Sequence, residues 1–287
     1  MDEAPTPKDS EKHVRNLKLI LSYDGSEFAG WQVQPDQPTI QGTLASAIGR
    51  LSGENVLPQG SGRTDAGVHA LAQVATFATI SAIPTSNWVT ALNDILPRSI
   101  RVLEVSAAPP DFHARKSARA KTYRYRMYRG PICPPFLARY VWHYLYPLSE
   151  DAMMAAAALV VGEHDFTSFA AADPERRGDE EVNNHRRHPS NALGAGGGPP
   201  RNMEILESNV RTIFSSAWTR EGEELIYTIR GTGFLHHMVR NLVGTFVLVG
   251  KGTLSQEDFS RVLEARSRPA AGPTAPASGL YLVGVEY

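Results

Sequence analysis

Cysteine and long apolar runs are the two features that this sequence almost lacks. Cys133 is the only cysteine among 287 residues, which excludes an intrachain disulfide and fits a reducing compartment. A helix that crosses a bilayer needs about 20 apolar residues, and the nearest candidate, Ala152 to Val161, has half that length. Residues 1–12 are polar and charged, without the apolar segment of a signal peptide. We therefore expect a cytoplasmic protein that does not contact a membrane.

The sequence also lacks an excess of positive or negative charge, and it lacks several familiar enzyme motifs. The 29 Lys and Arg residues nearly balance the 30 Asp and Glu residues, for a formal net charge of −1. This balance does not exclude nucleic-acid binding, because basic groups can gather on one face. The sequence also contains no Gly-x-Ser-x-Gly elbow, no Walker loop and no dinucleotide-binding fingerprint. The chemistry must therefore come from a different set of residues.

Segments with the period of strands alternate with segments that have the period of helices. The predicted strands cover residues 16–23, 74–79, 100–105, 121–128, 210–218, 225–230 and 280–285. The predicted helices cover residues 39–51, 88–96, 149–161, 235–249 and 256–266. This order, with turns that allow antiparallel pairing, predicts an α+β fold on mixed or antiparallel sheets.

Residues 171–201 fall outside this pattern. The segment combines a charged cluster around His185 and His188 with a stretch, residues 194–200, that has almost no apolar side chains. Such a composition cannot bury enough surface to offset the entropy of ordering it, so we expect a mobile insertion. Residues 268–278 are rich in Pro, Ala and Gly, but they lead directly into the last strand and predict an ordered, irregular loop.

A glycine-rich segment, residues 60–69, places Arg63, Thr64 and Asp65 between glycines. Glycine lets a backbone approach a ligand closely or take a positive φ. Two interpretations stand beside each other at this point. The segment is either a turn in which Asp65 binds local amides or a site that uses a carboxylate and a guanidinium.

A basic run with interleaved tyrosines extends from Phe112 to Arg129, with seven Lys and Arg residues and no carboxylate. Phosphates attract cations, and an extruded base stacks on an aromatic ring, so the run favours nucleic-acid binding. A solvated edge strand is the alternative. The candidate contacts to an RNA backbone are Arg115, Lys116, Arg119, Lys121, Arg124 and Arg126.

Two adjacent histidines, His236 and His237, follow a glycine-rich turn at the start of a predicted helix, in which His236 and Arg240 share a face. Paired histidines suggest a metal, but the Glu of a His-Glu-x-x-His site is missing and the sequence offers no third ligand nearby. We predict no metal site, and we keep a metal-dependent hydrolase as an alternative function.

Several segments, taken together and in order, resemble the tRNA pseudouridine synthase A family. They cover nearly the whole chain from about Asn16 to Tyr287. The matching pieces are Tyr23-Asp24-Gly25 with Gly30-Trp31-Gln32, Gly62 to Val68, Asp111 to Arg115, Tyr123-Arg124-Tyr125, Asp165 to Phe169, Phe234 to Asn241, and Ala271 to Pro276 with Gly279 to Leu282.

The resemblance implies the pseudouridine synthase fold, with two α/β lobes whose sheets join across a central basic cleft. We accordingly expect a disordered tail (1–15), an N-terminal lobe with the catalytic loop (16–110) and a C-terminal lobe (111–287). It also implies a homodimer that binds the anticodon stem-loop of tRNA and isomerises uridines 38, 39 and 40. The insertion at 171–201 departs from the family, which usually has a shorter connection there.

The resemblance assigns roles to five residues. It implies that Asp65 is the catalytic aspartate, that Tyr123 stacks on the target base and that Leu280 packs against the base from another side. It implies that Arg240 is the ion-pair partner of the aspartate and that Arg63 holds or replaces the flipped base. A degenerate, non-catalytic RNA-binding protein would be expected to lack the aspartate or the tyrosine, and both are present.

The implied reaction needs no cofactor, because uracil leaves C1′ at N1, rotates and rejoins through C5 without redox change or phosphoryl transfer. Pseudouridine formation should therefore be unaffected by EDTA once the folding of the tRNA substrate has been controlled for. The measurement is tritium release from C5-labelled uridine in tRNA, with and without the chelator. A loss of activity that zinc restores and magnesium does not would favour the hydrolase alternative or a structural metal.

Overall fold

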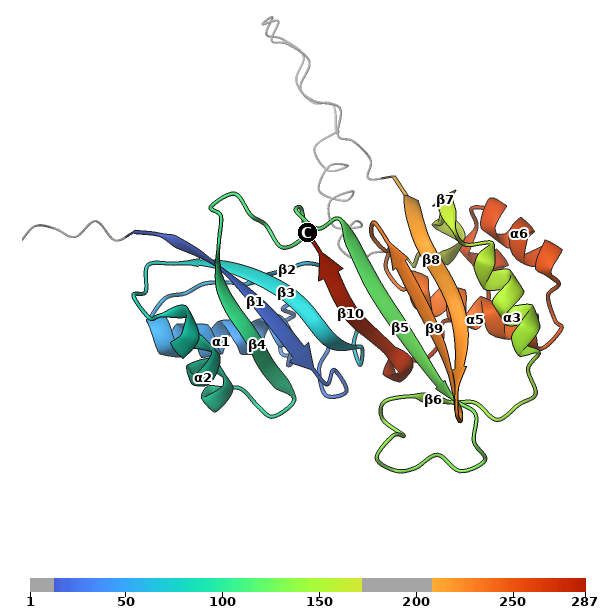
Figure 1. Ribbon diagram of the computed structural model, residues 1–287, viewed down its shortest axis with the longest axis horizontal. Helices are drawn as coiled ribbons and strands as arrows, with labels where there is room; N and C mark the ends of the chain where they lie inside the picture. The colour runs from blue at the N-terminus through green and yellow to red at the C-terminus, as the bar shows by residue number, and fades with distance from the viewer. Residues whose placement is uncertain (1–12, 172–207) are drawn as a thin grey trace, which may run out of the picture. The chain divides into compact units, whose positions relative to one another are not determined.

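The computed structural model describes residues 13–171 and 208–287 (Figure 1). Apart from Ala171, the predicted insertion at 171–201 lies outside these ranges. Most of the predicted tail at 1–15 lies outside them too, although Arg15 already belongs to the first strand. The chain forms two compact units. The first contains the described residues up to Arg124 together with residues 135–141 and 277–287, and the second contains residues 125–134, 142–171 and 208–276.

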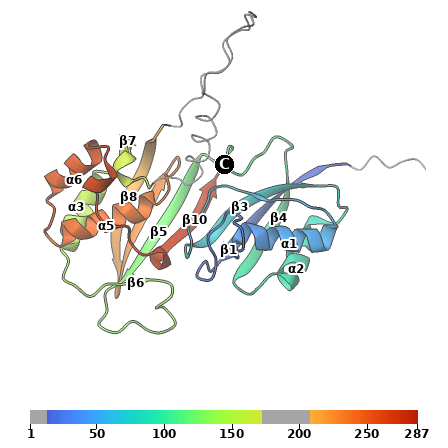
Figure 2. The same ribbon diagram turned by 180° about the vertical axis from the view of Figure 1, so that it is seen from behind.

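The first unit is a mixed sheet with two helices. Its strand order is β4-β1-β3-β10-β5, with β1 antiparallel to both β3 and β4 and with β10 parallel to β3. Helices α1 and α2 lie on one face of the sheet (Figures 1 and 2). The elements are β1 (Arg15–Tyr23), α1 (Ile40–Ser52), β2 (Gln59–Gly60), β3 (His69–Thr79), α2 (Thr85–Ile95), β4 (Ile100–Ala108), the first half of β5 (Ala120–Tyr128), η3 (Ala277–Gly279) and β10 (Leu280–Glu286).

The second unit is antiparallel between β9, β8 and β7, in the order β5-β9-β8-β7. Helices α3, α5 and α6 gather on one face of these strands (Figure 2). The elements are the second half of β5, β6 (Trp142–His143), α3 (Glu150–Ala158), β7 (Gly162–Asp165), η1 (Thr167–Phe169), β8 (Val210–Glu221), β9 (Glu224–Gly231), α5 (Met238–Gly250), α6 (Gln256–Glu264) and η2 (Arg268–Ala270).

Local sequence explains most of these elements. Leu17, Leu19 and Leu21 are fully buried at the period of two that marks a strand with one face in the core. The Thr39 side chain accepts a hydrogen bond from the amide of Gly42 and so caps α1. The turn at Gly222 joins β8 and β9, where Glu221 lies opposite Glu224. The α+β class and the mixed sheet that the sequence predicted are confirmed.

The unit boundaries differ from the predicted lobes, which met between residues 110 and 111. The start of β5 and the last strand belong to the first unit, because β10 pairs with β3 through Tyr281 opposite His69. The short strands β2, β6 and β7 were not predicted, since two to four residues carry too little periodicity.

The predicted helix at 235–249 was wrong at its start. Helix α5 begins at Met238, since His237 has a left-handed backbone with φ of 60°. Arg240 is therefore the third residue of the helix and His236 lies before it, so the spacing of four does not place them on one helix face. No helix in the described ranges has both the length and the apolar character needed to cross a bilayer.

The irregular loop after α6 is packed closely on α5 in the second unit. Thr245 accepts a hydrogen bond from the amide of Gly272 at 2.9 Å, and a Cβ added to Gly244 would collide with the carbonyl of Pro273. The loop that the sequence predicted to be ordered is thus fixed to the helix by contacts that only small residues permit.

Gly244→Ala should lower the free energy of unfolding by about 1–3 kcal/mol or more, because the methyl group pushes the Pro273 segment off the helix. Urea denaturation measures the change. Gly284→Ala is the matched control, since a Cβ there has no neighbour within 4 Å. Equal stability of the two variants would contradict the close packing of this loop.

Candidate active site

The loop between β2 and β3 carries Asp65, and its backbone is fixed on both sides of that residue. The Thr64 carbonyl accepts a hydrogen bond from the Trp31 amide at 3.0 Å, and the Gly67 amide donates to the Phe28 carbonyl at 3.3 Å. Gly67 has a φ of 77°, which favours glycine. The half-buried Asp65 is therefore presented by a backbone that has little freedom to move.

A buried polar network supports the start of this loop. Gln73 donates to the Gly62 carbonyl at 2.9 Å and accepts from the Ser61 hydroxyl at 2.6 Å. The hydroxyls of Tyr23 and Thr64 lie 2.9 Å apart. Burial raises the pKa of Tyr23 to about 12, with hydrogen bonds to Thr64 and Gln73 opposing it, so the phenol stays neutral. Sequence reasoning missed this network, although Gln73 within an apolar strand was a visible signal.

Lys121 also stabilises the start of the loop that carries Asp65. Its ammonium group donates to the carbonyl of Ser61 at 2.6 Å, and a Cβ added to Gly62 would lie 3.0 Å from that ammonium. The sequence made Lys121 a candidate contact to RNA phosphates. The structure places its charge against the backbone at the start of the Asp65 loop.

Tyr123 and Leu280 lie in the same unit as this loop. Tyr123 is 7% exposed and Leu280 is 5% exposed. Burial raises the pKa of Tyr123 above the range usual for tyrosine, and the nearby groups Tyr23 and Asp65 add to this effect. Asp65 acts electrostatically on Tyr123, so the carboxylate and the aromatic ring are near each other, and Leu280 begins the strand that pairs with the start of β3. Arg63, from the Asp65 loop, is exposed.

Arg240 belongs to the second unit, where its position is fixed by the loop after α6. Its Nε donates to the Ala275 carbonyl at 2.8 Å, and the Ala275 amide donates to the Arg240 carbonyl at 3.1 Å. Arg268 holds the same loop through the Gly272 carbonyl and the side chain of Asn241. The guanidinium of Arg240 is thus oriented before any substrate is present.

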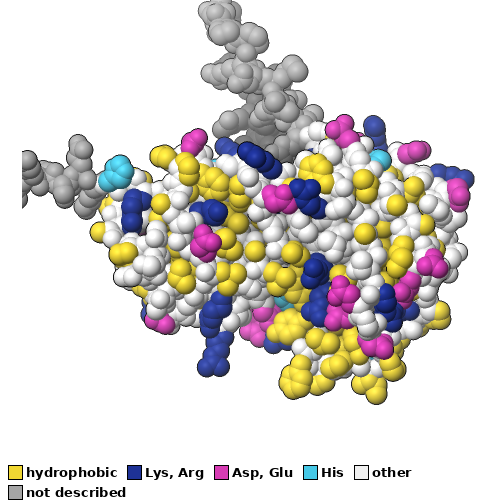
Figure 3. All heavy atoms as spheres, viewed as in Figure 1, with side chains coloured by type: hydrophobic (Ala, Val, Ile, Leu, Met, Phe, Trp, Pro, Cys, Tyr) yellow, Lys and Arg dark blue, Asp and Glu magenta, His cyan; other side chains and the backbone are white. Residues whose placement is uncertain are grey.

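The other basic candidates fall into two groups. Arg115, Lys116 and Arg119 are exposed. Arg126 forms a bidentate ion pair with Glu224, with distances of 2.7 and 2.6 Å, and Arg124 is half-buried. Lys and Arg side chains stand beside Asp and Glu at several places on the visible surface (Figure 3). An RNA contact through Arg126 would have to compete with its carboxylate partner.

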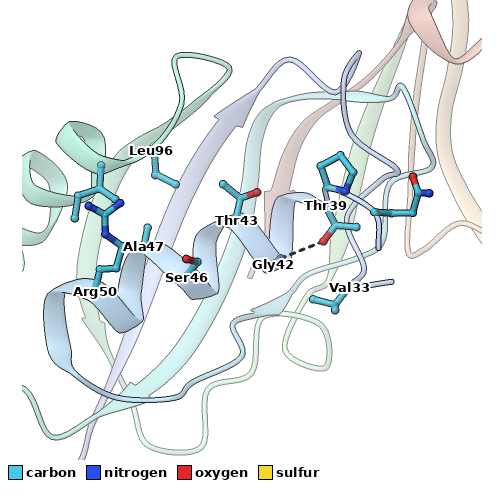
Figure 4. Close-up of a pocket in the computed structure, with 11 residues that line it drawn as sticks. Val33, Thr39, Gly42, Thr43, Ser46, Ala47, Arg50 and Leu96 are labelled. Atoms are coloured by element: carbon cyan, nitrogen blue, oxygen red, sulfur yellow. Dashed lines mark hydrogen bonds between the residues drawn. The ribbon is translucent and has the colours of Figure 1, made fainter. Parts of the chain in front are cut away.

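A surface hollow of about 400 Å³ lies beside α1 and contains none of the predicted site residues (Figure 4). Its polar side chains are those of Gln37, Thr39, Thr43, Ser46 and Arg50. The Thr39 hydroxyl is already engaged by the Gly42 amide at 3.2 Å. The lining contains no carboxylate, histidine or cysteine, so its hydroxyl groups have no base beside them that could activate one as a nucleophile.

Lys121→Met should lower turnover while leaving the salt dependence of RNA binding unchanged, because Lys121 supports the start of the loop that carries Asp65. Arg115→Met, from the exposed group, should weaken RNA binding and reduce the slope of log K against log salt by about 1. Filter binding at several salt concentrations, with single-turnover rates, separates the two effects. A reduced slope for Lys121→Met would return that residue to the RNA contacts.

Comparison with the sequences of known proteins identifies the family of this chain. The sequence profile described as tRNA pseudouridine synthase matches residues 19–115 and 201–287. A tRNA pseudouridine synthase A from Solibacter usitatus is 46% identical over 274 residues, covering 96% of this chain and 100% of that protein. The enzymes of that name from Moorella thermoacetica and Halalkalibacterium halodurans are 44% and 42% identical, covering 94% and 93% of this chain and 99% and 90% of their own lengths. The chain therefore belongs to the tRNA pseudouridine synthase family, isomerases that act on tRNA.

Proposed function

We propose that the protein isomerises uridine to pseudouridine in the anticodon stem-loop of tRNA, at positions 38, 39 and 40, with Asp65 as the catalytic residue. The observation that carries the proposal is the Asp65 loop, whose backbone is fixed on both sides of the carboxylate. The same unit contains Tyr123 and Leu280, which suit the two faces of an extruded base.

The reaction breaks the N1–C1′ glycosidic bond and forms a bond between C5 and C1′. The proton on C5 is lost and N1 gains one, so atoms and electrons balance without a redox partner. An ionised carboxylate serves this sequence as a nucleophile at C1′ or as a base at C2′. Both routes require Asp65 in a fixed position beside the ribose.

Extrusion of the target uridine requires a few kcal/mol of unpairing and unstacking. Tyr123 offsets part of this cost by stacking on the base, and Leu280 packs against the base from another side. The raised pKa of Tyr123 keeps its ring neutral, which suits a stacking surface. The exposed Arg63 fits the role of holding the flipped base or filling its place in the stack.

We propose further roles for Arg240, for a second copy of the chain and for three exposed basic residues. Arg240 is proposed to pair with the catalytic carboxylate in the complex with tRNA. Two copies of the chain are proposed to share one tRNA in a cytoplasmic homodimer, which light scattering with and without tRNA would test. Arg115, Lys116 and Arg119 are proposed to contact the phosphate backbone, and no cofactor is required.

Asp65→Asn should abolish pseudouridine formation while tRNA binding persists, because the substitution keeps size and shape and removes the negative charge. Tritium release from C5-labelled uridine measures turnover, and filter binding measures the complex. Asp36→Asn, in an exposed turn, is the matched control. Substantial tritium release by Asp65→Asn would exclude this residue as the catalytic group.

Tyr123→Ala should lose most turnover, whereas Tyr123→Phe should retain tRNA binding. Stacking is worth about 1–3 kcal/mol for each base and depends on the ring rather than on the hydroxyl. Single-turnover rates and dissociation constants for both variants test this. Equal losses in the two variants would show that Tyr123 is not a stacking surface.

A further inference from the structure

His69 is a buried titratable group to which the proposed reaction gives no role. It is 1% exposed and begins strand β3, directly after the loop that carries Asp65. Its ring stacks on Tyr281 with centroids 4.8 Å apart and an angle of 26° between the planes. Tyr281 follows Leu280 in the strand that pairs in parallel with β3. His69 therefore lies between the end of the Asp65 loop and the strand that begins with Leu280.

One ring nitrogen of His69 faces two partners with opposite requirements. Nδ1 accepts a hydrogen bond from the Gly25 amide at 3.1 Å, and it lies 3.2 Å from the Oδ1 of Asp24. The amide contact requires an unprotonated Nδ1, whereas a hydrogen bond to the carboxylate requires a protonated one. A single proton thus decides whether His69 is bonded to Gly25 or to Asp24.

The hydrogen bond between His69 and Gly25 affects the Asp65 loop, because the turn that contains Gly25 packs directly on the end of that loop. A Cβ added to Gly25 would collide with the Val68 carbonyl, and the Val68 amide donates to the Asp65 carbonyl at 3.1 Å. The chain of contacts from His69 through Gly25 and Val68 therefore reaches the backbone of Asp65. A loss of the His69–Gly25 bond would loosen this side of the loop.

The charged and titratable groups around His69 come from three segments. Asp24 follows β1, Arg139 and Tyr140 belong to the segment before β6, and Tyr281 belongs to β10. The Tyr140 hydroxyl donates to Asp24 at 3.0 Å, Arg139 lies 3.8 Å from the same carboxylate, and the Tyr281 hydroxyl donates to the Tyr140 carbonyl at 2.6 Å.

These surroundings favour an ionised Asp24 and a neutral His69. Burial opposes ionisation of Asp24, but hydrogen bonds from Ser26 and Tyr140 outweigh it and lower its pKa. Burial also lowers the pKa of His69, against the opposing effects of Asp24 and of the backbone at Ser278 and Arg139. At neutral pH the ring is therefore uncharged, and the tautomer that carries its proton on Nε2 accepts at Nδ1 from Gly25.

We propose that His69 is a positioning residue for the isomerisation, which holds the end of the Asp65 loop against strand β10 only while its imidazole is neutral. The proposal rests on the proposed role of Asp65. It makes His69 a proton-sensitive element of the site that touches neither the base nor the ribose.

The sign of the pH effect follows from the lowered pKa. The folded protein binds the proton on His69 less tightly than the unfolded chain, whose histidine has a pKa of about 6.5. As pH falls below this value, the fold loses stability, and turnover falls as Nδ1 is protonated and releases Gly25. Removing the Asp24 carboxylate removes an effect that raises the pKa of His69, so the loss of turnover should then occur at lower pH.

The test is the pH profile of single-turnover tritium release between pH 4.5 and 8 for the wild type, His69→Asn, His69→Phe and Asp24→Asn. The Asn oxygen can occupy the place of Nδ1 and accept from Gly25 without titrating. His69→Asn should therefore keep its rate in acid where the wild type declines. His69→Phe lacks the acceptor, so its rate should fall about tenfold to a hundredfold at every pH, with little change in tRNA affinity. Asp24→Asn should move the decline to lower pH, and His164→Asn, at a half-buried histidine of the second unit, should reproduce the wild-type profile.

A His69→Asn profile identical to that of the wild type would overturn the proposal, as would an Asp24→Asn decline at unchanged or higher pH. The thermal unfolding midpoint between pH 5 and 7.5 gives a second readout that needs no activity. The wild type should lose more stability in acid than His69→Asn does, and equal losses would also count against the proposal. A fully active Asp65→Asn variant would instead overturn the proposed function, so the two failures are distinguishable.

Discussion

In the core of the first unit, the amide of Gln73 accepts from Ser61 and donates to the carbonyl of Gly62, while Tyr23 reaches Thr64 through its hydroxyl. The side chains of Gln73, Ser61, Tyr23 and Thr64 are buried, and buried polar atoms cost free energy unless they find a partner. The loop that carries Asp65 supplies those partners. The backbone of the loop is thereby coupled to the hydrogen bonds of the core, and a shift of residues 61–64 would leave buried polar groups unpaired.

The second unit likewise uses hydrogen bonds to fix a side chain, in this case Arg240. Arg240 and Ala275 exchange two hydrogen bonds, one from the guanidinium and one between backbone groups. Arg268 and Asn241 then hold the surrounding loop in place. Both units therefore fix a charged side chain by engaging the backbone next to it, which reduces the ordering that substrate binding would otherwise require.

Most of the fold was predictable because the signals were local. The alternating leucines of β1, the cap at Thr39 and the turn at Gly222 each encode their own structure within a few residues. The family assignment was also available from motifs in order. The position of β10 beside β3 was not predictable, because parallel pairing between distant segments produces no periodic pattern in the sequence. The start of α5 was misjudged, since nothing in the sequence marks His237 for a left-handed backbone.

The sequence allowed us to predict which residues of the candidate site carry its chemical groups. It did not allow us to predict which residues hold those groups in position. Asp65 and Tyr123 belong to recognisable motifs, whereas Gln73, Lys121 and His69 act through contacts that span tens of residues in sequence. Lys121 illustrates the difficulty, because a lysine in a basic run has the same local signature whether it binds a phosphate or a carbonyl. Burial decides between the two, and burial depends on the complete fold.

The return of β10 to the first unit has a consequence for the order in which the protein becomes functional during synthesis. Leu280 and Tyr281 leave the ribosome long after the residues of β3, yet their strand lies beside β3 in the middle of the first unit's sheet. That sheet cannot be completed before β10 has been synthesised, and β3 keeps an unpaired edge until then. A nascent chain that ends before β10 therefore carries Asp65 without Leu280 and without the stacked ring of Tyr281. The sheet beside the Asp65 loop is thus completed late in synthesis.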